Sequence, residues 1–377
     1  MSLAAVETLP VLEPVVASTR GWITSIEEWE RLELEAHPGA REFWMSWLWL
    51  STWWQVYGTG RQLRIAVVEG QKWVSCPLYR QRRLGVRQLA FLGSASRRHA
   101  LGDAVPDAAE RMARWLAERR DWDSLKLEAV PAGERAAWKR GFDAADLQVC
   151  EGQCWLQRSI PLHRPWQEVT AGFRPGLLSN LARRERMLAR AGSVRLRQVA
   201  TSADLADVFE TCLAMEASGW KGDAGSAMAQ NPLARRFYSL LAQRAAERNQ
   251  LRLTLLELNG APIAFSLRLR HGNTLASLKI GYDRAHRRFA PGAVLQYQVL
   301  REAQAEGIEE VDLSGGDDAY KADWTACGQQ LGDLQVYNRT ALGRAARMRA
   351  CWRHALGADG STPAITPPVA STARSRC

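Results

Sequence analysis

The 377-residue sequence predicts an α/β protein with a mixed sheet, and one segment carries most of that prediction. Three runs with strand character, at 251–258, 262–270 and 274–282, follow one another across short turns. A basic turn, a helical pattern at 292–306 and a short apolar strand at 309–313 come next. Because the N-terminus of a helix carries free N–H groups, this order predicts an anion site beyond the end of the third strand.

The first half of the chain repeats this order. Residues 67–78 parallel residues 256–267, since each stretch reads as strand, polar turn with glycine and strand. Two tandem domains of one fold are therefore predicted, at 20–165 and 166–340. In the first domain we expect a helix at 42–57, strands at 63–68, 73–79 and 86–92, a helix at 106–119, a strand at 124–129, a helix at 133–144 and a strand at 148–156.

The second domain is predicted to open with a basic amphipathic helix at 173–191. A strand at 194–199 and helices at 202–218 and 232–248 follow it. Outside the two domains we expect a flexible arm at 1–19, a basic helix at 341–356 and a disordered tail at 357–377. The basic helix either packs its apolar stripe on the second domain or lies on an anionic membrane.

Charge and composition limit the kinds of partner that the protein is expected to have. The net charge of +10 and the pI near 9.5 favour anionic partners such as CoA, nucleic acid, a nucleotide-sugar or an acidic membrane surface. No window has the 18 or more apolar residues of a membrane helix, and no basic segment with an apolar run marks a secretory signal. The seven cysteines lack zinc spacing, so we expect reduced thiols, a cytoplasmic protein and no metal.

Tryptophans crowd one expected helix. Five of them fall in 44–54, more than a single face of a helix can bury. Most are expected in the core, and at least one or two on a sugar ring or at a membrane interface.

The turn before the helix at 292–306 is the candidate phosphate site. Backbone N–H groups and the helix dipole favour a phosphate there, and guanidinium groups suit charge-assisted contacts with it. The alternative is that the arginines only solvate a loop. The expected contacts are Arg284, Arg287, Arg288, Ala290, Gly292, Ala293 and Val294.

A carboxylate ends the last strand of this segment. Asp312 alternates with Val311 and Leu313, so its side chain faces the opposite side of the sheet. Ligands of open sheets bind at the ends of central strands. We expect Asp312 either to act as general base or to orient the acceptor, and the alternative is a cap on the Gly315–Gly316 turn.

Five short motifs, in order, resemble a known family. They are Glu216–Gly222, Lys279–Asp283, Ala290–Gly292, Asp312–Gly315 and Tyr320–Trp324. Together they are similar to the acetyltransferase domain of CelD-like cellulose-biosynthesis proteins, a GNAT-superfamily branch related to the Fem aminoacyl ligases. The resemblance implies two tandem GNAT-like domains, the first degenerate, with acetyl-CoA or another acyl-CoA as co-substrate. Phe289 stands where the family's phosphate signature has Gln or Arg, and Val294 replaces its last small residue.

The resemblance also implies roles for single residues. Tyr320 is expected to protonate the departing thiolate, and Lys321 to hold a phosphate or an acidic acceptor. Glu216 is a second candidate base. The remaining residues expected to line the acceptor cleft are Trp220, Lys221, Lys279 and Asp283, of which the last two alternatively pair with each other.

Taken together, the sequence predicts an acyl-CoA-dependent acyltransferase. The implied acceptor is an amine or hydroxyl of a sugar-containing or cell-envelope molecule, in polysaccharide biosynthesis, with peripheral contact at the inner membrane face. One alternative is a Fem-like ligase that draws an aminoacyl group from charged tRNA, which the arginine excess favours. Another is a non-catalytic binding protein of a polysaccharide-assembly complex, which Phe289 favours.

Overall fold

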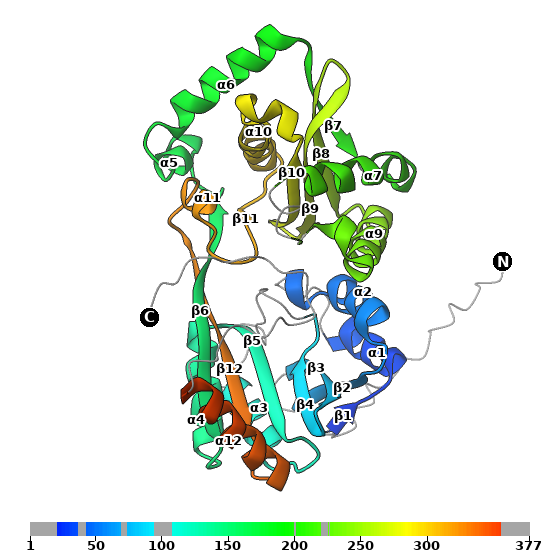
Figure 1. Cartoon of the computed structure of the whole chain (residues 1–377), viewed down its shortest axis with the longest axis vertical. Coiled ribbons are helices and arrows are strands. Elements are labelled where there is room, and N and C mark those ends of the chain that lie inside the picture. Colours follow the sequence, from blue (N-terminus) through cyan, green and yellow to red (C-terminus); the bar gives the residue numbers. More distant parts are fainter. Residues whose placement is uncertain are drawn as a thin grey trace, which may run out of the picture.

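A computed structural model describes residues 21–36, 43–68, 74–93, 108–199, 201–219, 225 and 227–355. Within these residues twelve strands form one continuous sheet in the order β1-β2-β3-β4-β5-β12-β6-β11-β10-β9-β8-β7 (Figure 1). The strands of the first part are β1 (Gly21–Ile23), β2 (Gln62–Val68), β3 (Val74–Arg83), β4 (Val86–Phe91), β5 (Ser124–Pro131) and β6 (Gln148–Pro161). Those of the second are β7 (Val194–Val199), β8 (Leu251–Leu258), β9 (Ala261–His271), β10 (Thr274–Tyr282), β11 (Glu310–Asp312) and β12 (Gly328–Tyr337).

The two parts repeat one topology. β2, β3 and β4 form an antiparallel meander whose last strand pairs in parallel with β5. β8, β9 and β10 form the same meander, and β10 pairs in parallel with β11. The predicted mixed α/β class and the repeat are confirmed.

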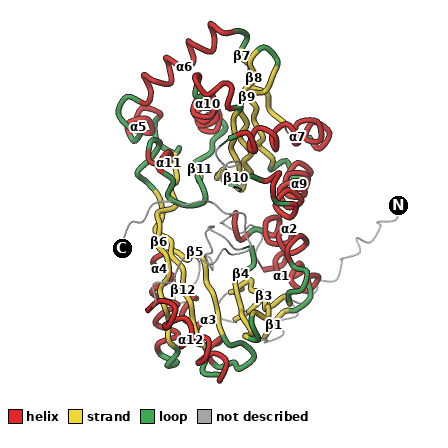
Figure 2. Tube along the Cα trace, viewed as in Figure 1, coloured by secondary structure: helices red, strands yellow, loops and turns green. Residues whose placement is uncertain are grey.

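Helices cover the sheet on both sides (Figure 2). They are α1 (Ile26–Ala36), η1 (Phe43–Met45), α2 (Trp47–Tyr57), α3 (Ala108–Ala117), α4 (Ala132–Asp143), α5 (Trp166–Ala171), α6 (Leu177–Ala191), α7 (Ser202–Ser218), η2 (Met228–Gln230), α9 (Pro232–Glu247), η3 (Arg284–Phe289), α10 (Pro291–Ala305), α11 (Ala319–Ala322) and α12 (Ala341–Ala355). Most lie within a few residues of the predicted spans. The predicted helix at 42–57 breaks at Ser46, because its hydroxyl accepts from the N–H of Trp49 and caps α2.

Two strands tie the parts together. β12, which follows the second repeat, lies between β5 and β6 of the first sheet. The last residues of β6, Ser159–Pro161, leave that sheet and pair with β11. The predicted boundary between 165 and 166 therefore does not separate the sheet, since the strand at 328–337 completes the first part rather than the second.

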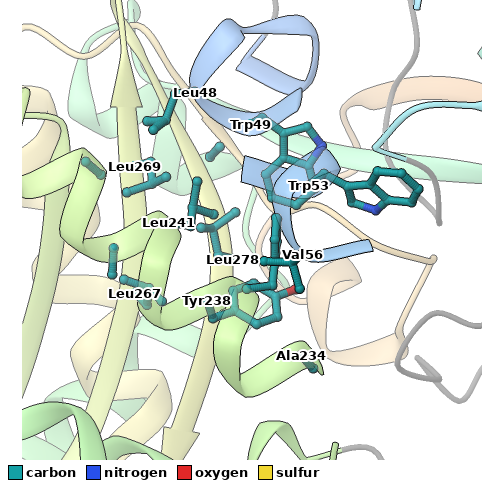
Figure 3. Packing of buried hydrophobic residues seen from close by; sticks show 14 of the residues in the cluster. Leu48, Trp49, Trp53, Val56, Ala234, Tyr238, Leu241, Leu267, Leu269 and Leu278 are labelled. Atoms are coloured by element: carbon teal, nitrogen blue, oxygen red, sulfur yellow. The ribbon is translucent and has the colours of Figure 1, made fainter. Parts of the chain in front are cut away.

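One hydrophobic core spans both parts. Trp49 and Trp53 of α2 pack with Tyr238 and Leu241 of α9 and with Leu267 of β9 (Figure 3). Trp44 also lies inside this core, and Trp47 and Trp54 pack against it. Helix α2 lies between two packed surfaces, so several of its faces are covered. Trp47 and Trp54 are only partly buried, and a contact of either with a sugar or a membrane stays a prediction.

Helix α12 lies on the first part, against β12 and β4, and not on the second domain as one prediction had it. Gly343 allows this approach, because a Cβ there would stand 2.8 Å from the carbonyl oxygen of Asp123. Leu342, Met348 and Trp352 remain exposed. No helix among the described residues is long and apolar enough to span a bilayer. The arm at 1–19 and the tail at 357–377 fall outside the described residues.

Candidate active site

A notch opens where β10 and β11 part. The two strands pair only through Thr274–Ala276 and Glu310–Asp312, and β10 continues to Tyr282 without β11 beside it. A bulge between Ser277 and Lys279 turns β10 at the point of separation. Beyond β11, Ser314 and Gly315 adopt positive φ and lead the chain away. The local sequence therefore creates a gap beside a central strand.

The turn after β10 brings a helix N-terminus to this notch. Asp283 caps η3 by accepting from the N–H of Ala285 and contacts His286 at 2.9 Å. Ala290 has φ 48°, which reverses the chain so that α10 starts at Pro291. The N–H groups of Ala293 and Val294 donate to the carbonyl of Ala290, whereas the N–H of Gly292 has no partner among the described residues. A Cβ at Gly292 would meet only Tyr282, at 3.5 Å.

The arginines of the turn are exposed and Phe289 is not. Arg284, Arg287 and Arg288 lie at the surface, whereas Phe289 packs in the core under α10. The signature position thus contributes packing in place of a polar contact. Arg184 of α6 donates to the carbonyl of Arg288 and holds α6 against η3. A shallow groove between them is lined by Met187, Arg190, Ala191, Arg288 and Phe289.

Tyr320 stands on α11 at the side of the notch. The residue is 44% exposed. Burial of its hydroxyl, and then the nearby Asp318, raise the pKa of Tyr320 above its usual value, and Arg268 acts in the opposite direction. The hydroxyl therefore remains protonated throughout the neutral range.

Lys321, the next residue, is held by the loop that precedes α11. Its Nζ donates to the carbonyls of Ser314 and Gly316 and lies 2.8 Å from the carboxylate of Asp318. The side chain is buried. Lys321 therefore fastens the 314–318 loop, and its contact with a phosphate or an acidic acceptor stays a prediction.

Asp312 lies on the opposite face of the sheet from Val311, as the alternation predicts. Both carboxylate oxygens are occupied: Trp44 donates to Oδ2 at 2.8 Å, Gln157 donates to Oδ1 at 3.1 Å and to Oδ2 at 3.0 Å, and the N–H of Ser314 donates to Oδ1 at 2.7 Å. Trp44 belongs to η1 and Gln157 to β6, so this carboxylate joins the two parts of the chain.

Glu216 and Lys279 form a buried ion pair on that same face. The Nζ of Lys279 lies 3.4 Å from Oε1 of Glu216, and the N–H of Met228 donates to Oε2 at 2.8 Å. The bulge in β10 turns Lys279 toward α7, while Asp283 stays in its own turn. The alternative in which Lys279 and Asp283 pair with each other is therefore wrong. Trp220 and Lys221 fall outside the described residues.

A family model built on known proteins matches the part of the chain that contains these residues. The family model described as an acetyltransferase (GNAT) domain covers residues 177–322, which include the notch, α10 and Tyr320. The chain has a GNAT acetyltransferase domain. This domain identifies the chain as an acyltransferase. Among the described residues no group of three His, Cys, Asp or Glu side chains is arranged to hold a metal ion.

Solved structures show the same fold over most of the chain. The crystal structure of FemX has a TM-score of 0.56 and 13% identity, with 83% of this chain and 96% of FemX covered. A conserved protein of unknown function from Bacteroides thetaiotaomicron has a TM-score of 0.54 and 12% identity, with 85% and 100% covered. At these identities the likeness concerns the fold. No curated protein matches in sequence at a significant level.

Three residues of the site were not predicted from the sequence. Trp44 and Gln157 hold Asp312 from distant parts of the chain, and Arg268 lies buried behind Tyr320. Only Arg268 had a local signal, because Ser266, Arg268 and Arg270 alternate with apolar residues in a strand expected to be central.

Proposed function

We propose that the chain is an acyl-CoA-dependent acyltransferase of the CelD-like branch. The acceptor would be an amine or hydroxyl of a sugar-containing or cell-envelope molecule in polysaccharide biosynthesis, at the cytoplasmic face of the membrane. The observation that carries the proposal is the notch between β10 and β11 with the N-terminus of α10 beside it. A thioester in the notch would have its diphosphate within reach of that helix terminus.

We attribute binding of the acyl-CoA donor to a backbone N–H group, the helix dipole and basic side chains. The N–H of Gly292 and the dipole of α10 favour a phosphate, and Arg284, Arg287 and Arg288 are exposed near it. Phe289 is not available for this purpose, so these groups would replace the usual polar anchor. The groove beside Arg190 and Arg288 offers a place for a further phosphate or for the base of the nucleotide.

Transfer requires a proton acceptor, a proton donor and positioning. The acceptor nitrogen or oxygen attacks the thioester carbon, the C–S bond breaks, and one proton moves to a base while another reaches the sulfur. Glu216 is the proposed base, with Lys279 as its countercharge. Tyr320 is the proposed acid, because its hydroxyl remains protonated at neutral pH. Asp312 is assigned to positioning, since the hydrogen bonds from Trp44 of η1 and Gln157 of β6 fix its carboxylate between the two parts of the chain.

The test is acceptor-dependent release of the CoA thiol by the purified chain, over a panel of amino- and hydroxyl-bearing sugars. Tyr320→Phe should lower turnover by roughly a hundredfold and leave donor binding unchanged. Tyr297→Phe is the matched control, because Tyr297 packs against Trp166, away from the notch. Binding of acyl-CoA without transfer to any acceptor would instead favour a non-catalytic binding protein.

A second candidate is transfer of an aminoacyl group from charged tRNA. Exposed arginines on α6, namely Arg183, Arg186 and Arg190, are the observation that favours it. Phosphate contacts release counterions, so binding of tRNA should weaken steeply with salt. Transfer from aminoacyl-tRNA, with no binding of acyl-CoA, would select this candidate over the first.

A further inference from the structure

A row of polar side chains lies beneath α10, on strands that are otherwise apolar. Ser266 and Arg268 of β9 lie two residues apart and face α10, where Nη2 of Arg268 donates to Oε1 of Gln296. Nε of Arg268 donates to the hydroxyl of Ser277, opposite it on β10, at 3.2 Å. Arg268 is 1% exposed, and Ser266, Ser277 and Gln296 are also buried. A positive charge is thus enclosed between the sheet and the helix.

Three buried donor groups in this row have no hydrogen-bond partner in the part of the chain that the structure describes. They are the hydroxyl of Ser266, Nη1 of Arg268 and Nε2 of Gln296. Native proteins satisfy nearly all buried polar groups with protein atoms, ligands or ordered water, so these three neighbouring groups call for an acceptor that is either a ligand or water. The bond between Arg268 and Gln296 fixes which amide atom is oxygen, so that Nε2 is the free end of the amide.

The charge of Arg268 has no counterion among the described residues. Arg252 stands opposite it on β8 and has the carboxylate of Glu306, the residue after α10, at 3.6 Å. Among the described residues, the hydrogen-bond partners of the Arg268 side chain are the neutral Ser277 and Gln296. Burial lowers the pKa of Arg268 to about 10, and Tyr320 acts in the opposite direction, so the group is still a cation at neutral pH. Leaving such a charge unpaired is strongly unfavourable.

We propose that Ser266, Arg268 and Gln296 form a recess for one carboxylate, and that the acyl group of the donor carries it. This inference rests on the proposed acyl-CoA-dependent function and narrows it to dicarboxylic acyl donors. One buried cation calls for one negative charge, and a guanidinium group with a free Nη1 suits a carboxylate. A phosphate dianion would leave a net charge in the recess.

The recess lies next to the notch. Ser277, which contacts Arg268, is the residue at which β10 begins to part from β11, and its carbonyl accepts from the hydroxyl of Ser314. Tyr320 reaches from the surface at the side of the notch to the neighbourhood of Arg268, as their mutual effect on pKa shows. An acyl chain whose thioester lies in the notch would therefore direct its far end toward the recess.

The experiment compares the affinities of succinyl-CoA and acetyl-CoA by calorimetry, for the parent chain, Arg268→Met and Gln296→Leu. The parent should bind succinyl-CoA at least tenfold more tightly, and Arg268→Met should reduce that ratio to about one. Gln296→Leu should reduce it in part. Arg270→Met, two residues along β9 and bonded to the carbonyl of Gly272, is the control and should keep the ratio.

The Tm of the ligand-free proteins shows whether Arg268 serves to bind a ligand or to hold the fold together. Removing an unpaired buried charge should leave the Tm of Arg268→Met equal to or above that of the parent. Equal affinities of the parent for both donors, or a ratio that persists in Arg268→Met, would overturn the proposal and leave ordered water as the occupant. If neither donor binds, the proposed function fails. In that case the change in Tm of the parent chain on adding succinate tests whether the recess binds a carboxylate. A rise in Tm that Arg268→Met abolishes supports it, and no rise overturns it.

Discussion

Trp44 donates its indole N–H to Oδ2 of Asp312 across 2.8 Å, and 268 positions of sequence separate the two residues. The bond joins η1 of the first part to the end of β11 in the second. Gln157 of β6 holds the same carboxylate from the strand shared by the two parts. The position of the notch therefore depends on the first part of the chain, the one that the sequence predicts to be a degenerate domain.

Trp44→Phe tests whether Asp312 acts through position. The change removes a hydrogen bond to a buried carboxylate, so the free energy of unfolding should fall by about 1.5–3 kcal/mol, more than in the control, which loses a bond to a neutral carbonyl. Trp49→Phe is the control, since Trp49 packs in the same core and donates to Gly93 instead. Turnover of Trp44→Phe and Asp312→Asn should fall together. Loss of turnover in Asp312→Asn alone would mean that Asp312 itself exchanges a proton.

Glu216→Gln should destabilise the fold by about 3–5 kcal/mol, because it leaves the buried Lys279 without a counterion. Urea denaturation measures this loss. The double variant Glu216→Gln/Lys279→Met should regain much of the stability without regaining turnover, if Glu216 is the base. A double variant as active as the parent would remove Glu216 from the mechanism.

Asp333 makes the stability depend on pH. Burial, and then the nearby Glu128, raise the pKa of Asp333 to about 6 from 3.8. The folded state thus holds a proton that the unfolded state releases, so the stability contributed by this group is present below about pH 4 and is lost as pH rises through 6. Asp333→Asn should therefore gain up to about 3 kcal/mol over the parent at pH 7, and little at pH 4. Chemical denaturation at the two pH values measures it, with Asp143→Asn as an exposed control. An equal gain in stability at pH 4 and pH 7 would mean that the effect does not come from the proton bound to Asp333.

Helix α12 should bind anionic vesicles. Leu342, Met348 and Trp352 are 47%, 63% and 67% exposed beside Arg344, Arg347 and Arg349, a composition typical of interfacial helices. Basic residues near an acidic leaflet contribute about 1 kcal/mol each, and salt screens them. Trp352→Ser/Met348→Ser should lose co-sedimentation with acidic vesicles at low salt. Leu84→Ser, an exposed leucine of the turn between β3 and β4, is the control. Equal recovery of all three proteins would leave the helix without a membrane role.

Local patterns predicted the elements of the second part well. β7, β8, β10 and α7 have the expected bounds, because alternation and helical periodicity are local properties of the sequence. The turn at Ala290 and the face of Asp312 followed from the same patterns. β12 was missed, since glycine and glutamine weaken its alternation and its partners are distant strands.

Local sequence patterns did not predict where single charged side chains point. Lys321 turns into its own loop, and the bulge at Ser277 sends Lys279 toward Glu216, 63 positions earlier in the chain. Asp312 depends on Trp44 in the other domain. The contact of Asp312 with Trp44 is set by the packing of the two parts, whereas those of Lys321 and Lys279 depend on a turn and a bulge inside the second part, which periodicity does not encode.

The affinity of CoA for Gly292→Val tests the central claim most directly. A side chain at Gly292 has room in the fold, since only Tyr282 lies near its Cβ, but it would stand between the helix terminus and a diphosphate. We expect CoA to bind more than tenfold more weakly, a loss above about 1.4 kcal/mol, with the fold intact. Gly133→Val, at the second position of α4 with open space around it, is the matched control and should bind CoA like the parent. Unchanged affinity in a folded Gly292→Val would contradict the placement of the donor at this turn.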